Sequence, residues 1–435
     1  MLVNRDGGNV AELITVTVAF AVINVTSWLL QQPLPFEHLA SFDGEHYYAV
    51  AEQITHGESP HSSWPFVYRI GTMFLVALFF KGNLLFGFEM INLVANVVTV
   101  ILLVYWLRLY LSDWRIRVLL VLLFLTQWHG PIRYLYYDSA YVDFWMFAFL
   151  LLGLILIHKM RASPSLLKLL SLGLVSFVGV IFREVVLVIP LALLFATNPV
   201  VMRGKSFSML SSLHELRESF RMPPLTFFVP LVLGLLGLLT THLVVSQEGD
   251  YSYLRAVYRW AYEKPLLSYL HAWFVAFGPI LVLALYDWRR LVSFLRDNQF
   301  MVVYFVAFAA LGWIGGGDVE RILYWSMPVV YLLIGRSMED NLDLLRSWAL
   351  VAVLVVSQLL SQRVFWTLPD YPSDYATPWP ILSIPSSSFQ LLDLYTIHGD
   401  RVIETISLAE YSLLCALLLW WFGYRTKHLE KERGC

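Results

Sequence analysis

Charged residues are scarce in this sequence. Asp, Glu, Lys and Arg make up 14% of its 435 residues, whereas 58% are hydrophobic and the mean hydropathy is +0.64. Soluble globular chains have about 25% charged residues, so the composition excludes a soluble domain and a disordered protein. The formal net charge of −2 and the pI of about 6.6 give no sign of a basic surface, and nucleic acid is not expected as a partner.

Cysteines and glycine-rich phosphate motifs are also lacking. The two cysteines are Cys415, inside an apolar run, and Cys435, which argues against a disulfide framework and excludes a thiolate metal site. The one Gly-Lys-Ser, at 204–206, has Pro199 where a phosphate-binding loop requires its first glycine. Neither ATP-driven transport nor a cytoplasmic nucleotide-sugar donor is therefore indicated.

Long uncharged runs are abundant. A helix needs about 20 apolar residues to cross a bilayer, and six uncharged runs are of that order: 13–36, 90–107, 185–202, 222–247, 265–286 and 298–317. Shorter or interrupted apolar runs cover 117–130, 139–158, 166–182, 322–337, 347–362 and 405–423. The sequence predicts an all-α, polytopic membrane protein with about 12 transmembrane helices, forming a single integral membrane domain over 1–435.

The basic residues are distributed unevenly between the loops. If the short apolar stretch 68–80 lies at the interface, most Lys and Arg fall in one set of loops, which the positive-inside rule assigns to the cytoplasm. Both termini are then cytoplasmic, and the loops 31–85 and 362–404 lie on the extracytoplasmic face of the plasma (inner) membrane. The first loop is expected to contain interfacial helices. The second is rich in proline and is predicted to be a lid or acceptor platform, or else a passive connector.

The first outer loop contains a candidate general base. Residues 42–48 read Phe-Asp-Gly-Glu-His-Tyr-Tyr, and Asp43 precedes a helical pattern. An Asp in this position can cap the helix. It can also act as a general base that takes a proton from an alcohol, alone or with Glu45.

Further acids and arginines recur at the outer ends of the predicted spans. They form four groups: Arg133 with Asp138 and Asp143, Arg183-Glu184, Arg255 with Arg259, and Asp318 with Arg321 after the glycines 315–317. An adjacent Arg and Glu point to different faces of a helix, so Arg183 and Glu184 are expected to have distant partners. Snorkelling or ion pairing explains each group singly. Together they suggest a site where arginines bind a lipid phosphate and carboxylates activate a hydroxyl.

These motifs resemble the glycosyltransferase C superfamily, whose members are polytopic enzymes that take a sugar from a polyprenyl-phosphate donor. The resemblance rests on the segment 42–48, Tyr68-Arg69, Leu85-Phe86-Gly87 opening a long helix, Asp138, Arg183-Glu184, and Asp318 with Arg321 before Pro328. It covers the order of elements over residues 12–340. Within the superfamily it is greatest to the mannosyltransferase-like and lipid-A-sugar-transferase-like branches.

The resemblance implies that Asp43 is the catalytic base of an inverting transfer, with Glu45 as the second carboxylate of the catalytic site. It implies donor-phosphate binding by Arg69, Arg183 and Arg321. Acceptor-binding or supporting roles are implied for Asp138, Glu184, Asp318, His46, Tyr47 and Arg133. A divalent cation, Mg²⁺ or Mn²⁺, held by Asp43 and Glu45 is left open, because some members of the superfamily work without a metal.

The predicted function is transfer of a hexose or pentose from a polyprenyl-phosphate-linked donor in the membrane. The acceptor is a hydroxyl of a glycan, lipid or protein at the extracytoplasmic face. Two alternatives stay open. One is a secondary transporter or lipid flippase using the same outer carboxylates, although the sequence shows no two related halves. The other is a non-catalytic membrane scaffold.

Overall fold

The computed structural model describes residues 5–31, 33, 43–127, 130–196, 224–249, 252–362, 378–379, 382–383 and 401–432. Within these residues the protein is almost entirely helical, which confirms the predicted all-α class. The strands are short and form two-stranded sheets: β1 (His61–Ser63) with β2 (Ser246–Glu248), and β3 (Pro378–Trp379) with β4 (Leu382–Ser383).

Six helices of the described part are long and apolar enough to cross a membrane. They are α1 (Arg5–Leu30), α4 (Leu84–Arg108), α5 (Trp114–Thr126) with α6 (Pro131–Leu135), α7 (Phe144–Ala162), α11 (Val229–Val244) and α21 (Arg401–Glu432). A seventh is counted if α15 (Trp288–Asp297) and α16 (Gln299–Ile314), which are bent by 113° at their junction, form one span.

Other apolar helices are shorter. They are α3 (Ile70–Phe79), α8 (Leu166–Phe182), η3 (Glu184–Leu187) with α9 (Val188–Leu193), α13 (Leu266–Phe277) and α19 (Trp348–Ser361). To these α18 (Met327–Asp340) adds a largely buried helix. The expected number of about 12 crossings therefore stays a prediction.

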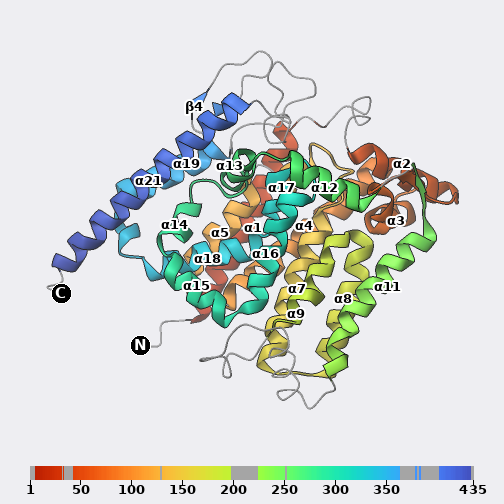
Figure 1. Cartoon of the computed structure of the whole chain (residues 1–435), viewed down its shortest axis with the longest axis horizontal. Coiled ribbons are helices and arrows are strands. Elements are labelled where there is room, and N and C mark those ends of the chain that lie inside the picture. Colours follow the sequence, from red (N-terminus) through yellow and green to blue (C-terminus); the bar gives the residue numbers. More distant parts are fainter. Residues whose placement is uncertain are drawn as a thin grey trace.

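The long helices pack side by side as a bundle. Contacts are extensive between α8 and α11, between α4 and α7, and between α7 and α8. Helices α8 and α11 approach closely because Gly237 lies against the backbone of Phe177, where a Cβ would overlap the carbonyl oxygen. Figure 1 shows α2 (Asp43–His56), α12 (Tyr253–Glu263) and α17 (Val319–Tyr324) at one end of this bundle, termed the site end, and α15 at the other.

One of the long uncharged runs predicted to form a single span is broken at a glycine. The run 265–286 forms two helices, α13 and α14 (Leu281–Tyr286), rather than one. Gly278 takes a φ of 75°, which other residues rarely adopt, and Pro279 has no N–H with which to continue the helix. In the gap the Ile280 N–H donates to Gln358 Oε1 at 3.1 Å, so a side chain replaces the missing backbone partner.

The opposite end of the bundle is held by a buried ion cluster. Glu12 of α1 is fully buried, and its Oε2 lies 2.6 Å from Arg117 Nη2 and 2.9 Å from Arg108 Nη2. Two guanidiniums thus compensate one carboxylate that burial would otherwise disfavour. Arg108 and Arg117 are therefore at the same end as the start of α1.

A short parallel ladder closes one side of the site end. Strand β1 pairs with β2, so that Ser62 lies opposite Gln247, and the Tyr68 hydroxyl donates to Gln247 Oε1 at 3.1 Å. The ladder ties the first loop to the segment that follows α11. Between them, β1 and α3 flank the short helix η2 (Phe66–Tyr68).

The two loops predicted on the outer side are described to different extents. Most of the loop 31–85 is described and contains α2 and α3. Most of the loop 362–404 lies outside the described residues. Its function as a lid or acceptor platform therefore stays a prediction.

Candidate active site

A cavity of about 1040 Å³ opens at the site end. Its walls come from α2, η2, η3, β2, α12, α17 and the glycine turn 315–317. Five guanidiniums and three carboxylates of the described residues line it: Arg69, Arg183, Arg255, Arg259, Arg321, Asp43, Glu184 and Asp318. The fold thus brings into one cavity charged residues that are far apart in the sequence.

Asp43 faces the cavity from the start of α2, which begins at this residue. Its carboxylate is half-buried, and its Oδ2 lies 3.7 Å from Arg321 Nη1. The same guanidinium places Nη2 2.8 Å from Asp318 Oδ2 and lies over the Tyr141 ring, 5.2 Å from its centroid. Arg321 is therefore a fixed positive charge that orients the Asp43 carboxylate.

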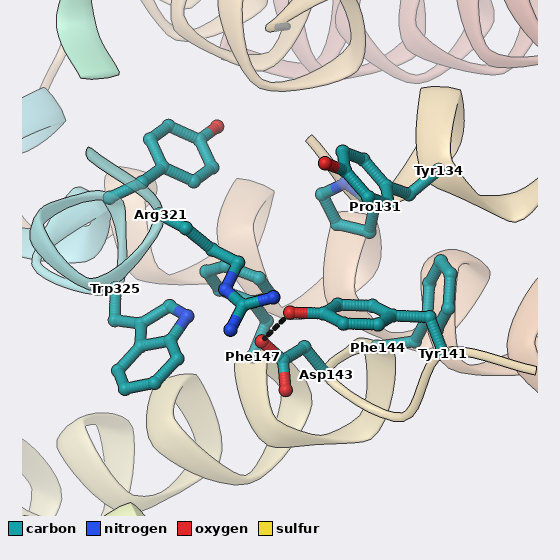
Figure 2. Close-up of a pocket in the computed structure, with 9 residues that line it drawn as sticks. Pro131, Tyr134, Tyr141, Asp143, Phe144, Phe147, Arg321 and Trp325 are labelled. Atoms are coloured by element: carbon teal, nitrogen blue, oxygen red, sulfur yellow. Dashed lines mark hydrogen bonds between the residues drawn. The ribbon is translucent and has the colours of Figure 1, made fainter. Parts of the chain in front are cut away.

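Arg183 is buried and paired. It is 2% exposed, forms an ion pair with Asp143, and lies 5.0 Å from the centroid of the Trp325 ring. The Tyr141 hydroxyl donates to the second oxygen of Asp143 at 2.8 Å. In Figure 2 the Arg321 guanidinium points toward this Tyr141–Asp143 pair, beside Trp325, around a small pocket of about 10 Å³. The positive charge of Arg183 is thus already compensated by Asp143.

Arg69 and Glu184 form a bidentate ion pair. The distances are 3.1 Å from Nε to Oε2 and 2.8 Å from Nη2 to Oε1, and Arg69 Nη1 also donates to the Tyr47 hydroxyl at 2.8 Å. Burial raises the pKa of Glu184, but the Arg69 and Arg183 guanidiniums outweigh it and lower that pKa to about 2. Arg183 and Glu184 therefore have the distant partners that their adjacency predicted, which confirms that expectation.

Asp138 lies against Gly44, the residue that follows Asp43. It is buried, and a Cβ on Gly44 would overlap its carboxylate. Burial, and then the nearby charge of Asp43, raise the pKa of Asp138 to about 7. Asp138 therefore holds its proton at acidic pH, next to the first turn of α2.

Ionisation of Asp138 is expected to destabilise the folded protein. The folded state raises the pKa from 3.8 to about 7 and so binds the proton more tightly than the unfolded chain. The resulting stabilisation is complete below pH 3.8 and is lost as the pH rises through about 7, at no more than about 1.4 kcal/mol per pH unit. Thermal inactivation at about pH 5 and about pH 8 measures this loss. Asp138→Asn should show a smaller decrease in Tm than the wild type, and equal decreases would contradict the expectation.

Comparison with known proteins gives similarity only at the level of structure. No protein-family model matches the sequence, and no curated protein matches it. The Archaeoglobus fulgidus oligosaccharyltransferase in the apo form matches with a TM-score of 0.47 and 14% identity, over 78% of this chain and 52% of that chain. Archaeal oligosaccharyltransferase AglB from Archaeoglobus fulgidus, in complex with an inhibitory peptide and a dolichol-phosphate, matches with a TM-score of 0.43 and 13% identity, over 77% and 51%.

Both solved structures are oligosaccharyltransferases by their descriptions. The chain spans about half the length of the two solved structures, and the likeness is one of fold.

Glu45, predicted to act beside Asp43, is exposed and does not line the cavity. Residues two positions apart in a helix point to nearly opposite sides, so the two carboxylates diverge. Within the described residues no group of three or more His, Cys, Asp or Glu is placed to hold a metal ion. Asp43 and Glu45 therefore do not fit a divalent cation, and Asp138 is the carboxylate that adjoins Asp43.

Three other predicted residues do not line the cavity but contact the elements that surround it. His46 stacks on Phe66 with ring centroids 4.5 Å apart. Tyr47 is buried and accepts the hydrogen bond from Arg69. Arg133 is buried, and its Nη1 donates at 2.8 Å to the backbone carbonyl that follows α19. Their contacts position α2, η2 and the end of α19.

Lys264 holds the glycine turn, a role that the sequence analysis did not assign. It is buried between α12 and α13, and its Nζ donates to the carbonyls of Gly312 at 2.6 Å and Gly316 at 2.7 Å. Burial lowers the pKa of Lys264 to about 8, against the opposing effect of Glu320 and Asp318. The available signal was a lone lysine at the start of a predicted span, where an unsatisfied charge is costly.

Proposed function

We propose that the protein is an integral membrane glycosyltransferase that moves a sugar from a polyprenyl-phosphate donor to an acceptor hydroxyl of a glycan, lipid or protein. The observation that carries this proposal is a single cavity lined both by the Asp43 carboxylate and by guanidiniums from the residue before η3, from α12 and from α17. Its volume of about 1040 Å³ suits a sugar and its phosphate, since small-molecule sites occupy about 300–1,000 Å³. A carboxylate and several guanidiniums in one site are what activation of a hydroxyl and departure of a phosphate require.

Asp43 acts as the general base in this proposal. Its carboxylate takes the proton of the acceptor hydroxyl, and the hydroxyl oxygen attacks the anomeric carbon. The bond from that carbon to the phosphate oxygen breaks, and its electron pair leaves with the phosphate as polyprenyl phosphate. Because attack comes from the face opposite the leaving phosphate, the anomeric configuration inverts.

The paired guanidiniums supply a fixed positive potential. Arg69, Arg183 and Arg321 are held by carboxylates, rings or both. They cannot swing away as negative charge develops on the leaving oxygen. Charges oriented in advance stabilise a transition state without reorganising during the reaction, which is usually the largest electrostatic contribution to catalysis.

The site end is proposed to face away from the cytoplasm, in the plasma (inner) membrane. The distribution of Lys and Arg between the loops supports this orientation. A tag inserted at 375 is expected to react with an impermeant label on intact cells, and a tag at 430 only after the cells are opened. The reverse labelling would overturn the orientation.

Turnover in proteoliposomes with a panel of polyprenyl-phosphate-linked hexoses and pentoses tests the activity. Release of polyprenyl phosphate together with a new glycosidic bond on the acceptor is the expected result. Movement of the intact lipid-linked sugar across the bilayer, with no bond cleaved, would identify a flippase and overturn the proposal.

A further inference from the structure

Helix α12 brings two exposed guanidiniums to the cavity. Arg255 and Arg259 lie one helical turn apart, and both line it. Arg255 has no ion-pair partner within the described residues. Arg259 Nε lies 2.9 Å from Glu263 Oε2, but the two side chains of this pair are 57% and 48% exposed. Because exposed pairs of this kind contribute little, both guanidiniums are free to take another anion.

The other guanidiniums of the cavity already have carboxylate partners, and none of the three arginine side chains is more than 19% exposed. Removing one partner from a buried pair leaves an uncompensated charge, which is strongly unfavourable. A phosphate would have to compete with these existing partners. The pairs are Arg69 with Glu184, Arg183 with Asp143, and Arg321 with Asp318 and Asp43.

The geometry of an inverting transfer separates the base from the leaving phosphate. The two lie on opposite faces of the anomeric carbon. A guanidinium that touches the base is therefore badly placed to touch the leaving oxygen, and Arg321 lies 3.7 Å from Asp43. The arginines of α12 come from a separate element, which packs against α16.

The outward stripe of α12 is suited to the headgroup layer of a bilayer. Leu254, Tyr258 and Tyr262 recur every four residues and are 83%, 72% and 81% exposed. The two tyrosine rings stack with centroids 6.1 Å apart. Tyrosines beside an apolar residue, with arginines on the neighbouring face, are typical of helices that lie in the membrane interface. The phosphate of a membrane lipid lies at the same depth.

We propose that Arg255 and Arg259 bind the phosphate of the lipid-linked donor and hold it as it leaves, with α12 lying in the headgroup layer. The assignment rests on the transferase function proposed above. It places the direct phosphate contact on α12. Arg321 then orients Asp43, and Arg69, Arg183 and Arg321 together give the cavity its positive electrostatic potential.

Binding of radiolabelled polyprenyl phosphate to the full-length protein in nanodiscs of neutral lipid tests this assignment without turnover. Arg255→Gln/Arg259→Gln is expected to weaken binding at least tenfold with no change in Tm. The matched control is Arg289→Gln/Arg296→Gln, which removes two exposed arginines from α15 at the opposite end of the bundle. The control should bind like the wild type, and wild-type binding by the α12 variant would overturn the assignment.

Competition identifies the source of the phosphate. Unlabelled polyprenyl phosphate should displace the probe, whereas inorganic phosphate and polyprenol without phosphate should not at the same concentration. Displacement by inorganic phosphate would show a site for free anions. The same binding measurement is repeated in nanodiscs rich in phosphatidylglycerol. If wild type and variant then bind the probe equally, the arginines of α12 bind bulk anionic lipid. Either result overturns the assignment, while sugar transfer with Asp43 as the base would stand independently.

Discussion

Asp43→Asn is expected to abolish sugar transfer while the fold is retained. The amide has almost the shape of the carboxylate but cannot accept the proton of the acceptor hydroxyl, and a positioned general base contributes about 10²–10⁴-fold to the rate. The rate constant kcat should fall by about that factor. Arg321 keeps its 2.8 Å contact with Asp318 in the variant, so little loss of Tm is expected. Turnover with a lipid-linked donor and a thermal melt measure the two quantities.

Glu52→Gln is the matched control. Glu52 lies on the same helix as Asp43, is exposed, and does not line the cavity. This variant should transfer sugar at close to the wild-type rate. If Asp43→Asn does so as well, the assignment of the base is wrong.

Gly44→Ala is expected to have the second largest effect. The added Cβ would overlap the Asp138 carboxylate. Either Asp138 or the start of α2, which carries Asp43, therefore has to move. Displacement of a catalytic group by about 1 Å can cost a factor of about 10² in rate. Overpacking also costs about 1–3 kcal/mol of stability. The turnover rate and the Tm should therefore both decrease.

Gly82→Ala separates this steric effect from a general effect of replacing a glycine. A Cβ on Gly82 would meet no atom within 4 Å, so the control should behave like the wild type. Equal activity of Gly44→Ala and Gly82→Ala would show that the close approach of Asp138 to Gly44 has no bearing on the reaction.

The positions of the helices could be predicted because membrane helices are long and apolar. The run 166–182 coincides with α8, and the run 405–423 lies within α21. The break at Gly278 was missed because hydropathy records the free energy of transfer to lipid and not the backbone φ angle. The adjacent Gly-Pro dipeptide was the local signal for it.

The composition of the site could be predicted in part. Asp43, Arg183 and Arg321 were expected on one side of the membrane because the spans alternate in direction, and they line one cavity. Their partners could not be predicted, since pairing depends on the rotation and depth of each helix. The ion pair of Arg183 with Asp143 is one such case. The divergence of Glu45 from Asp43, by contrast, follows from helical geometry alone.

The parallel pairing of β1 with β2 has a consequence for protein engineering. Ser62 and Gln247 are far apart in the sequence, yet the segments that contain them form the two strands of one ladder. A chimaera that imports the 43–80 segment from another sequence must import the counterpart of 246–248 with it. If only one segment is exchanged, the residues of the two strands no longer match in register. The imported segment then loses the backbone pairing that holds it to the rest of the protein.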